Sequence, residues 1–144
     1  MITVRVINAH PVRRVPVRRT ARLVRRVVQG EGIRRAAVTV IVVDSRRIRR
    51  INRRYLAHDF VTDVIAFPLE KSPGLEGEIY VNLDRARSQA KEYGVTAWNE
   101  IVRLVVHGTL HLAGYDDRSR RKAARMRKRQ EMLVDRLTGK RKRQ

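Results

Sequence analysis

The sequence predicts a small α+β fold, in which a mixed sheet of about four strands packs against helices. Two observations predict this class. Short β-branched runs are interspersed along the chain with segments in which apolar residues recur at helical spacing. The length of 144 residues suits one domain with a real core, and no internal repeat or long linker divides it. Residues 1–144 are therefore expected to form a single domain.

The first half of the chain is predicted to run strand, helix, strand, helix. Ile2–Asn8 alternates in the manner of a half-buried strand, and Thr20–Gln29 carries Leu and Val at three- and four-residue spacing. Ala36–Val43 is a nearly continuous β-branched run, which is typical of a central strand. Ser45–Tyr55 then returns to helical period, with arginines opposite its apolar positions.

The middle of the chain is predicted to continue with strands and a helix. Thr62–Phe67 reads as a short strand closed by a proline, and Lys71–Gly77 reads as a loop rich in Pro, Gly and Ser. Glu78–Asn82 is expected to be a strand that leads into a helix over Asp84–Tyr93.

Two more helices are predicted in the last third. Thr96 is placed to cap a helix that runs to about Leu112. Ser119 is placed to cap a very basic helix that ends near Leu137, and residues 138–144 are expected to form a frayed basic tail. The sequence leaves open whether this last helix docks on the domain or on a partner.

Composition excludes several classes of protein. Without cysteine, the chain has no disulfide, no Cys-ligated zinc, no iron–sulfur cluster and no thiol nucleophile. No apolar run approaches the roughly 20 residues of a membrane span, and arginines stand where a signal peptide would need an apolar core. We therefore expect a cytoplasmic protein that has no membrane partner.

The net charge of +20 is unevenly distributed. Residues 1–54 carry 16 Lys and Arg against 2 acids, and residues 118–144 carry 13 against 2, whereas residues 55–117 carry 5 against 10. Any single arginine pair can be an ordinary solvated helix face. The two basic flanks taken together favour a polyanionic partner, because guanidinium groups match phosphate oxygens.

The residues that carry chemistry lie together near the end of the predicted Thr96–Leu112 helix. His107 and His111 are four residues apart, so both rings point from one helix face. Gly114 allows the chain to fold back, which places Asp117 as a third ligand. Two imidazoles and a carboxylate suit a catalytic zinc ion with an open coordination position.

Other interpretations of this segment stay open. Two histidines at this spacing are often ordinary partly buried side chains, and the residues after them can form a plain turn. The spacing also resembles that of zinc peptidases. Gly108 argues against a peptidase, because the HExxH pattern needs a glutamate there as the general base.

The segment His107–Asp117 (HGTLHLAGYDD) closely resembles the signature of the YbeY family, bacterial metal-dependent endoribonucleases of ribosomal RNA maturation. Ile51–Tyr55 followed by Thr62–Pro68 (TDVIAFP) is similar to a second block of this family, and Gly77–Ile79 leading into the Asp84–Gly94 helix is similar to a third. The resemblance covers most of the chain. It implies a small α+β fold, one zinc ion per chain, and ribosomal RNA, the small ribosomal subunit and its proteins as partners.

Three residues differ from the family pattern. A third histidine is usual where this chain has Asp117, and an arginine attributed to RNA contact is common where it has Leu56. His58, two residues later, is unusual for the family. It is interpreted either as a cation or general acid near the metal, or as a surface loop residue.

The resulting prediction is a zinc-dependent endoribonuclease that cuts single-stranded RNA in small-subunit ribosomal RNA maturation and ribosome quality control. Its metal ligands are His107, His111 and Asp117, and His58 completes the candidate catalytic set. The main alternative is a ribosome-associated RNA-binding assembly factor with a structural metal and little nuclease activity. A zinc peptidase is the weaker alternative, since protein substrates give no reason for the basic flanks.

Overall fold

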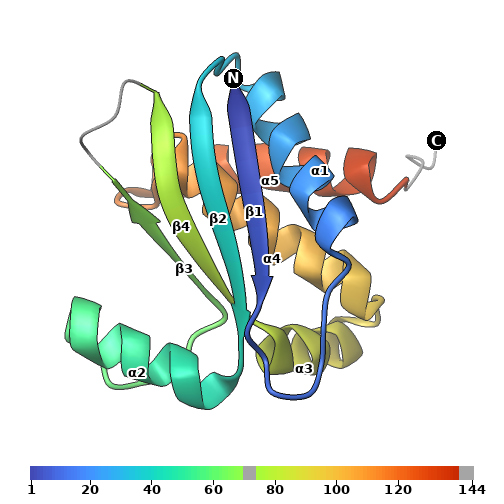
Figure 1. Cartoon of the computed structure of the whole chain (residues 1–144). Coiled ribbons are helices and arrows are strands. Elements are labelled where there is room, and N and C mark those ends of the chain that lie inside the picture. Colours follow the sequence, from blue (N-terminus) through green and yellow to red (C-terminus); the bar gives the residue numbers. More distant parts are fainter. Residues whose placement is uncertain (70–73, 140–144) are drawn as a thin grey trace.

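A four-stranded mixed sheet organises the molecule (Figure 1). The computed structural model describes residues 1–69 and 74–139. The strands lie in the order β1 (Ile2–Asn8), β2 (Ala36–Val43), β4 (Leu75–Asn82) and β3 (Val64–Pro68). β1, β2 and β4 run parallel to one another, and β3 is antiparallel to β4. The predicted α+β class, with its mixed sheet, is confirmed.

The helices form a layer on one face of this sheet, with one exception. Apolar side chains of α1 (Val17–Gly30), α3 (Leu83–Tyr93), α4 (Ala97–Leu112) and α5 (Arg120–Leu137) share the main core with the sheet. α2 (Ser45–Leu56) lies apart from that layer, at the lower left of Figure 1. No helix in residues 1–69 and 74–139 is long and apolar enough to cross a membrane.

The alternation of β2 produces two cores. Val38, Val40 and Val42 join the main core under the helix layer. Ile41 and Val43 point to the other face, because successive strand residues alternate. There they pack against two further buried side chains, Ile48 of α2 and Ile65 of β3. The small second core therefore holds α2 at the carboxyl end of β2.

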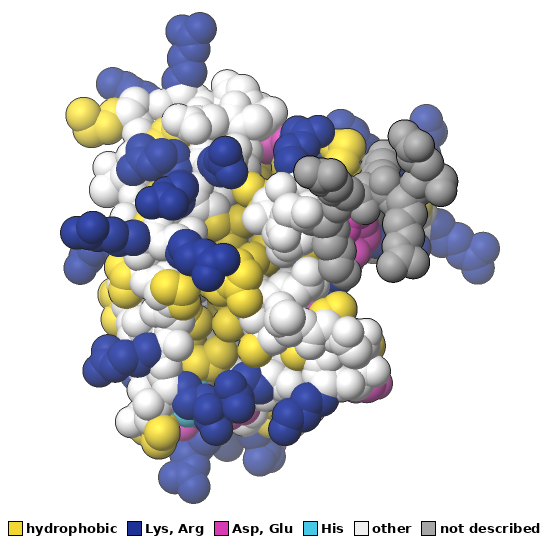
Figure 2. Space-filling view, turned by 90° about the vertical axis from the view of Figure 1, so that its right-hand side faces the viewer, with side chains coloured by type: hydrophobic (Ala, Val, Ile, Leu, Met, Phe, Trp, Pro, Cys, Tyr) yellow, Lys and Arg dark blue, Asp and Glu magenta, His cyan; other side chains and the backbone are white. Residues whose placement is uncertain are grey.

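The basic C-terminal helix docks on the domain. Met126, Leu133 and Val134 of α5 are buried in the main core, and α5 packs against α4. Apart from the partly buried Arg129, the arginines and lysines of α5 are exposed. Figure 2, which looks from the side of α1, shows Lys and Arg side chains spread around an apolar strip rather than gathered into one patch.

Several predicted boundaries were wrong. α1 begins at Val17 after Pro16, and Thr20, the predicted start, is a buried interior residue whose hydroxyl donates to the Pro16 carbonyl. β4 begins at Leu75 rather than Glu78, because Leu75 pairs with Ala36 of β2. The loop predicted over residues 71–77 therefore ends before Leu75, and residues 71–73 lie outside the described part.

Other boundaries moved by smaller amounts or were met. β3 begins at Val64, two residues after the predicted start. Thr96 and Ser119 cap α4 and α5, as predicted, by accepting hydrogen bonds from backbone N–H groups three residues ahead. Of the predicted tail, residues 140–144 lie outside the described part, and Thr138 donates to the Val134 carbonyl.

Candidate active site

A cleft of about 340 Å³ lies where α2, the loop after it, β3 and the second half of α4 meet. Three histidines line it together with apolar and small polar side chains. The lining residues are Asn52, Leu56, His58, Phe60, Thr62, Val64, Ile65, Ala66, His107, Gly108 and His111. The cleft therefore combines imidazole groups with apolar side chains.

α4 supplies two of these histidines from one helix face. The ring centroids of His107 and His111 are 6.4 Å apart. Between them, Gly108 lets the helix approach the sheet closely, because a Cβ at this position would lie 2.6 Å from Cγ2 of Ile79 in β4. This contact also explains why a glutamate, which a zinc peptidase would need here, is excluded on steric grounds.

α5 orients the ring of His107. The side chain of Gln130 donates from Nε2 to Oε2 of Glu131 at 3.1 Å, which leaves its Oε1 as the acceptor. Nδ1 of His107 lies 2.7 Å from this Oε1 and therefore carries the ring proton as donor. Nε2 is then the ring nitrogen of His107 left free by this contact.

The support of His107 extends through a chain of charged groups between α3, α4 and α5. Arg103 donates to Glu131 and, from Nε, to Oε1 of Glu100 at 3.2 Å. Nε2 of Gln89 donates to the other Glu100 oxygen at 2.7 Å. Burial raises the pKa of Glu100, and the hydrogen bonds from Gln89 and Arg103 oppose that rise. Glu100 is only 1% exposed, so without Gln89 and Arg103 its buried charge would destabilise the fold.

A separate set of contacts orients His111. Nδ1 of His111 donates to the backbone carbonyl of Tyr115 at 3.1 Å. The Tyr115 hydroxyl donates to Glu31 at 2.7 Å, and Arg129 of α5 binds the other Glu31 oxygen at 2.6 Å and 2.9 Å. The end of α1 thus anchors the turn that fixes the ring of His111.

His111 is held in the form that binds a metal ion. Desolvation and the neighbouring charge of His107 hold the pKa of His111 below its ordinary value, against the opposing charges of Asp117 and Asp116. His111 is therefore neutral at neutral pH. Both rings donate from Nδ1 to a carbonyl-type oxygen, the arrangement by which proteins fix Nε2 for a metal. The donor pair fits zinc.

Comparison with known proteins decides the family. The family model described as "Endoribonuclease YbeY" matches residues 6–138. The chain belongs to the YbeY family. Endoribonuclease YbeY of Chlorobaculum parvum is 36% identical over 119 residues, which cover 83% of this chain and 84% of that protein. Endoribonuclease YbeY of Chlorobium luteolum is 39% identical over 116 residues, which cover 81% and 85%.

A solved structure has a similar fold. The solution structure of TM1509 from Thermotoga maritima superposes with a TM-score of 0.68 at 29% identity, covering 96% of this chain and 90% of that one. The resemblance noted from the signature segments is thereby confirmed over nearly the whole YbeY domain.

Of the predicted site residues, the structure brings three together and not the fourth. His58, His107 and His111 line one cleft, and Leu56 lines it as well. Asp117 does not line the cleft. Among residues 1–69 and 74–139, no three His, Asp or Glu side chains are grouped closely enough to hold a metal ion. The assignment of Asp117 as the third ligand stays a prediction.

Sequence reasoning missed the residues that hold the histidines. Gln130 and Glu31 lie far from the signature in sequence, and no spacing rule points to them. The fourth histidine, His10, pairs through Nε2 with Asp84 at 2.7 Å. Its Nδ1 accepts two backbone N–H groups, so this pair joins loop and helix ends and leaves no nitrogen for chemistry.

Proposed function

We propose that this chain is a zinc-dependent endoribonuclease that cuts single-stranded RNA in the maturation of small-subunit ribosomal RNA and in ribosome quality control. The observation that carries the proposal is the pair of imidazoles in one cleft, each with Nδ1 engaged and Nε2 left for a metal. The relatives' name, Endoribonuclease YbeY, supports the reaction class.

His107 and His111 would hold the metal, with Asp117 as the proposed third ligand. The chemistry that zinc supplies when bound is polarisation of a phosphoryl oxygen and acidification of a water molecule. Hydrolysis of a phosphodiester adds this water across one P–O bond and requires a proton on the leaving oxygen. His58, which also lines the cleft, is proposed to donate that proton or to bind a phosphate oxygen.

The arginine-rich flanks suit phosphate groups, which supports RNA as the substrate class. Single strands are favoured because proteins reach unpaired bases and exposed backbone more readily than the deep groove of an RNA duplex. Ribosomal RNA, the small ribosomal subunit and its proteins are the proposed partners, met in the cytoplasm.

The test is cleavage of a 5′-labelled single-stranded ribosomal RNA fragment by the zinc-loaded protein. His111→Ala, purified in the same way, controls for contaminating nuclease. We expect discrete products from the wild type and none from the variant. Equal cleavage by both proteins would contradict the assignment of the site.

The second candidate is a ribosome-associated RNA-binding factor with a structural metal. Leu56 favours it, because its side chain cannot stabilise charge on the phosphate as an arginine would. RNA binding by the wild type without cleavage, under conditions in which zinc is bound, would support this candidate over the nuclease.

A further inference from the structure

The outer face of α2 is a strongly basic helical surface beside the cleft. Six of its twelve residues are arginines, and its buried residues are Ile48 and Asn52. Arg46, Arg50 and Arg53 follow one another at spacings of four and three, so they form a stripe along one side of the helix. We call these three residues the arginine stripe.

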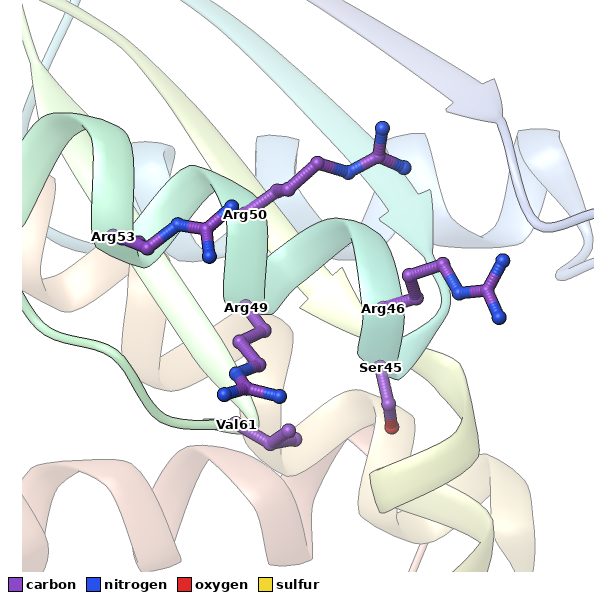
Figure 3. A pocket seen from close by; sticks show the side chains of 6 residues that line it. All are labelled: Ser45, Arg46, Arg49, Arg50, Arg53 and Val61. Atoms are coloured by element: carbon purple, nitrogen blue, oxygen red, sulfur yellow. The ribbon is translucent and has the colours of Figure 1, made fainter.

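The arginine stripe has no acidic partner in the described part of the chain. Arg49, on the same helix, donates from Nε to Asp59 at 2.9 Å, whereas no carboxylate of residues 1–69 and 74–139 lies within ion-pair distance of the stripe. Figure 3 shows Arg49 turned down beside Val61, while the three stripe side chains extend away from it. Neighbouring cations without counter-charges repel one another, and a bound polyanion removes that cost.

The surface is hollowed beside the stripe. An open hollow of about 550 Å³ is lined by Ser45, Arg46, Arg49, Arg50, Arg53 and Val61 (Figure 3). A second hollow, of about 680 Å³, is also lined by Arg50 and Arg53, together with Tyr55 and Tyr80. The guanidinium groups of Arg50 and Arg53 therefore border concave surfaces on both sides of the helix, which suits a chain lying across them.

The loop after α2 joins this surface to the cleft. Its residues alternate: His58, Phe60 and Thr62 line the histidine cleft. Asp59 and Val61, between them, contact or line the arginine side. α2 itself does the same, since Asn52 and Leu56 form a wall of the cleft. One short loop thus separates the two sites, and an extended strand can occupy both.

We propose that Arg46, Arg50 and Arg53 bind consecutive backbone phosphates of the single-stranded RNA whose scissile phosphate lies in the histidine cleft. This inference rests on the proposed function and names the surface that holds its substrate. The stripe places positive charge on the helix whose Asn52 and Leu56 line the cleft. Arginine forks suit phosphate oxygens without reading the base sequence.

The experiment measures binding of a fluorescein-labelled single-stranded RNA over a range of NaCl concentrations. All proteins carry His111→Ala, so cleavage does not interfere. The test variant combines Arg46→Gln, Arg50→Gln and Arg53→Gln. The matched control combines Arg18→Gln, Arg22→Gln and Arg26→Gln in α1, which removes the same charge from exposed positions outside the cleft.

Each lost phosphate contact lowers the slope of log K against log salt by about 0.7 for single strands, so we expect the test variant to lose about 2 in slope. Its affinity should fall at least about tenfold at low salt, and the α1 control should change far less. Equal losses in both variants would mean that net charge alone acts, and an unchanged slope in the test variant would also overturn the inference.

A charge-preserving variant checks the interpretation. Arg46→Lys, Arg50→Lys and Arg53→Lys together should restore the salt slope, because the slope counts neutralised phosphates. A slope that stays low would contradict phosphate binding. Failure of the proposed function can be told apart from failure of this inference. The first appears as no RNA cleavage by the protein with His111 intact. The second appears as RNA binding that does not depend on the arginine stripe.

Discussion

Oε1 of Gln130 in α5 lies 2.7 Å from Nδ1 of His107 in α4 and fixes the tautomer of this ring. The contact gives the basic C-terminal helix a defined part in the candidate site. A second residue of α5, Arg129, acts on the other histidine through Glu31 and Tyr115. α5 is therefore a support for both candidate metal ligands.

Replacing Gln130 tests this support. Gln130→Met removes the acceptor with little change in volume, and we expect zinc affinity to fall by about 10- to 100-fold. In the metal-free protein, ¹⁵N NMR of the imidazole should show His107 shifting from the Nδ1–H to the Nε2–H tautomer. Gln130→Glu keeps an acceptor and should retain the original tautomer. An identical tautomer in Gln130→Met would contradict the positioning role.

Asp117 is the predicted ligand that the structure does not group with the histidines. If it binds the metal, Asp117→Ala should weaken zinc binding strongly, because it removes a donor. Asp117→His should bind zinc more tightly than Asp117→Ala, because it places another donor at the same position. Calorimetric titration with zinc measures both. Asp116→Asn is the matched control, because the Asp116 carboxylate accepts from the backbone of Arg118. Unchanged affinity in Asp117→Ala would remove this residue from the ligand set.

The close approach of α4 to the sheet makes Gly108 intolerant of a side chain. Gly108→Ala would bring a Cβ to 2.6 Å from Cγ2 of the fully buried Ile79. We expect a loss of about 1–3 kcal/mol in the free energy of unfolding, measured with urea. Combining it with Ile79→Ala removes the clash, so the double variant should lose less than the two single losses added together. Strict additivity would rule out the steric explanation.

The pair of His10 and Asp84 predicts a specific pH dependence of stability. Burial raises the pKa of Asp84, but hydrogen bonds from His10 and the Ser45 N–H, with the charges of His10 and Arg13, bring it below the ordinary 3.8. A lowered carboxyl pKa stabilises the fold above the ordinary value and loses this effect as pH falls through the folded-state value.

Asp84→Asn should therefore be less stable than the wild type at pH 5–6, with the difference shrinking below about pH 4. Thermal unfolding across this pH range measures it. A difference between the two proteins that stays constant down to pH 3 would show that the charge of Asp84 does not act in this way.

The order of strands and helices followed from local patterns, because alternation, helical spacing and capping residues act within a few positions of the chain. The β-branched run of residues 36–43 is the central strand, and Thr96 and Ser119 cap their helices. The start of β4 was misjudged because Leu75 enters the sheet by pairing with Ala36, a distant residue that no local pattern reveals.

For the site, the spacing of His107 and His111 was sufficient to place both rings on one helix face, and the signature segments were sufficient to indicate the YbeY family. The sequence by itself thus determined the helix that carries the chemistry. Only the tertiary structure decided that His58 lines the same cleft as these rings, that α5 docks on the domain, and that Gln130 and Glu31 fix their orientation. The physical reason is that hydrogen bonds and packing between elements depend on which distant segments the fold brings together. Glu31 and Tyr115, which follow α1 and α4, meet only because both helices pack in the same layer of the fold.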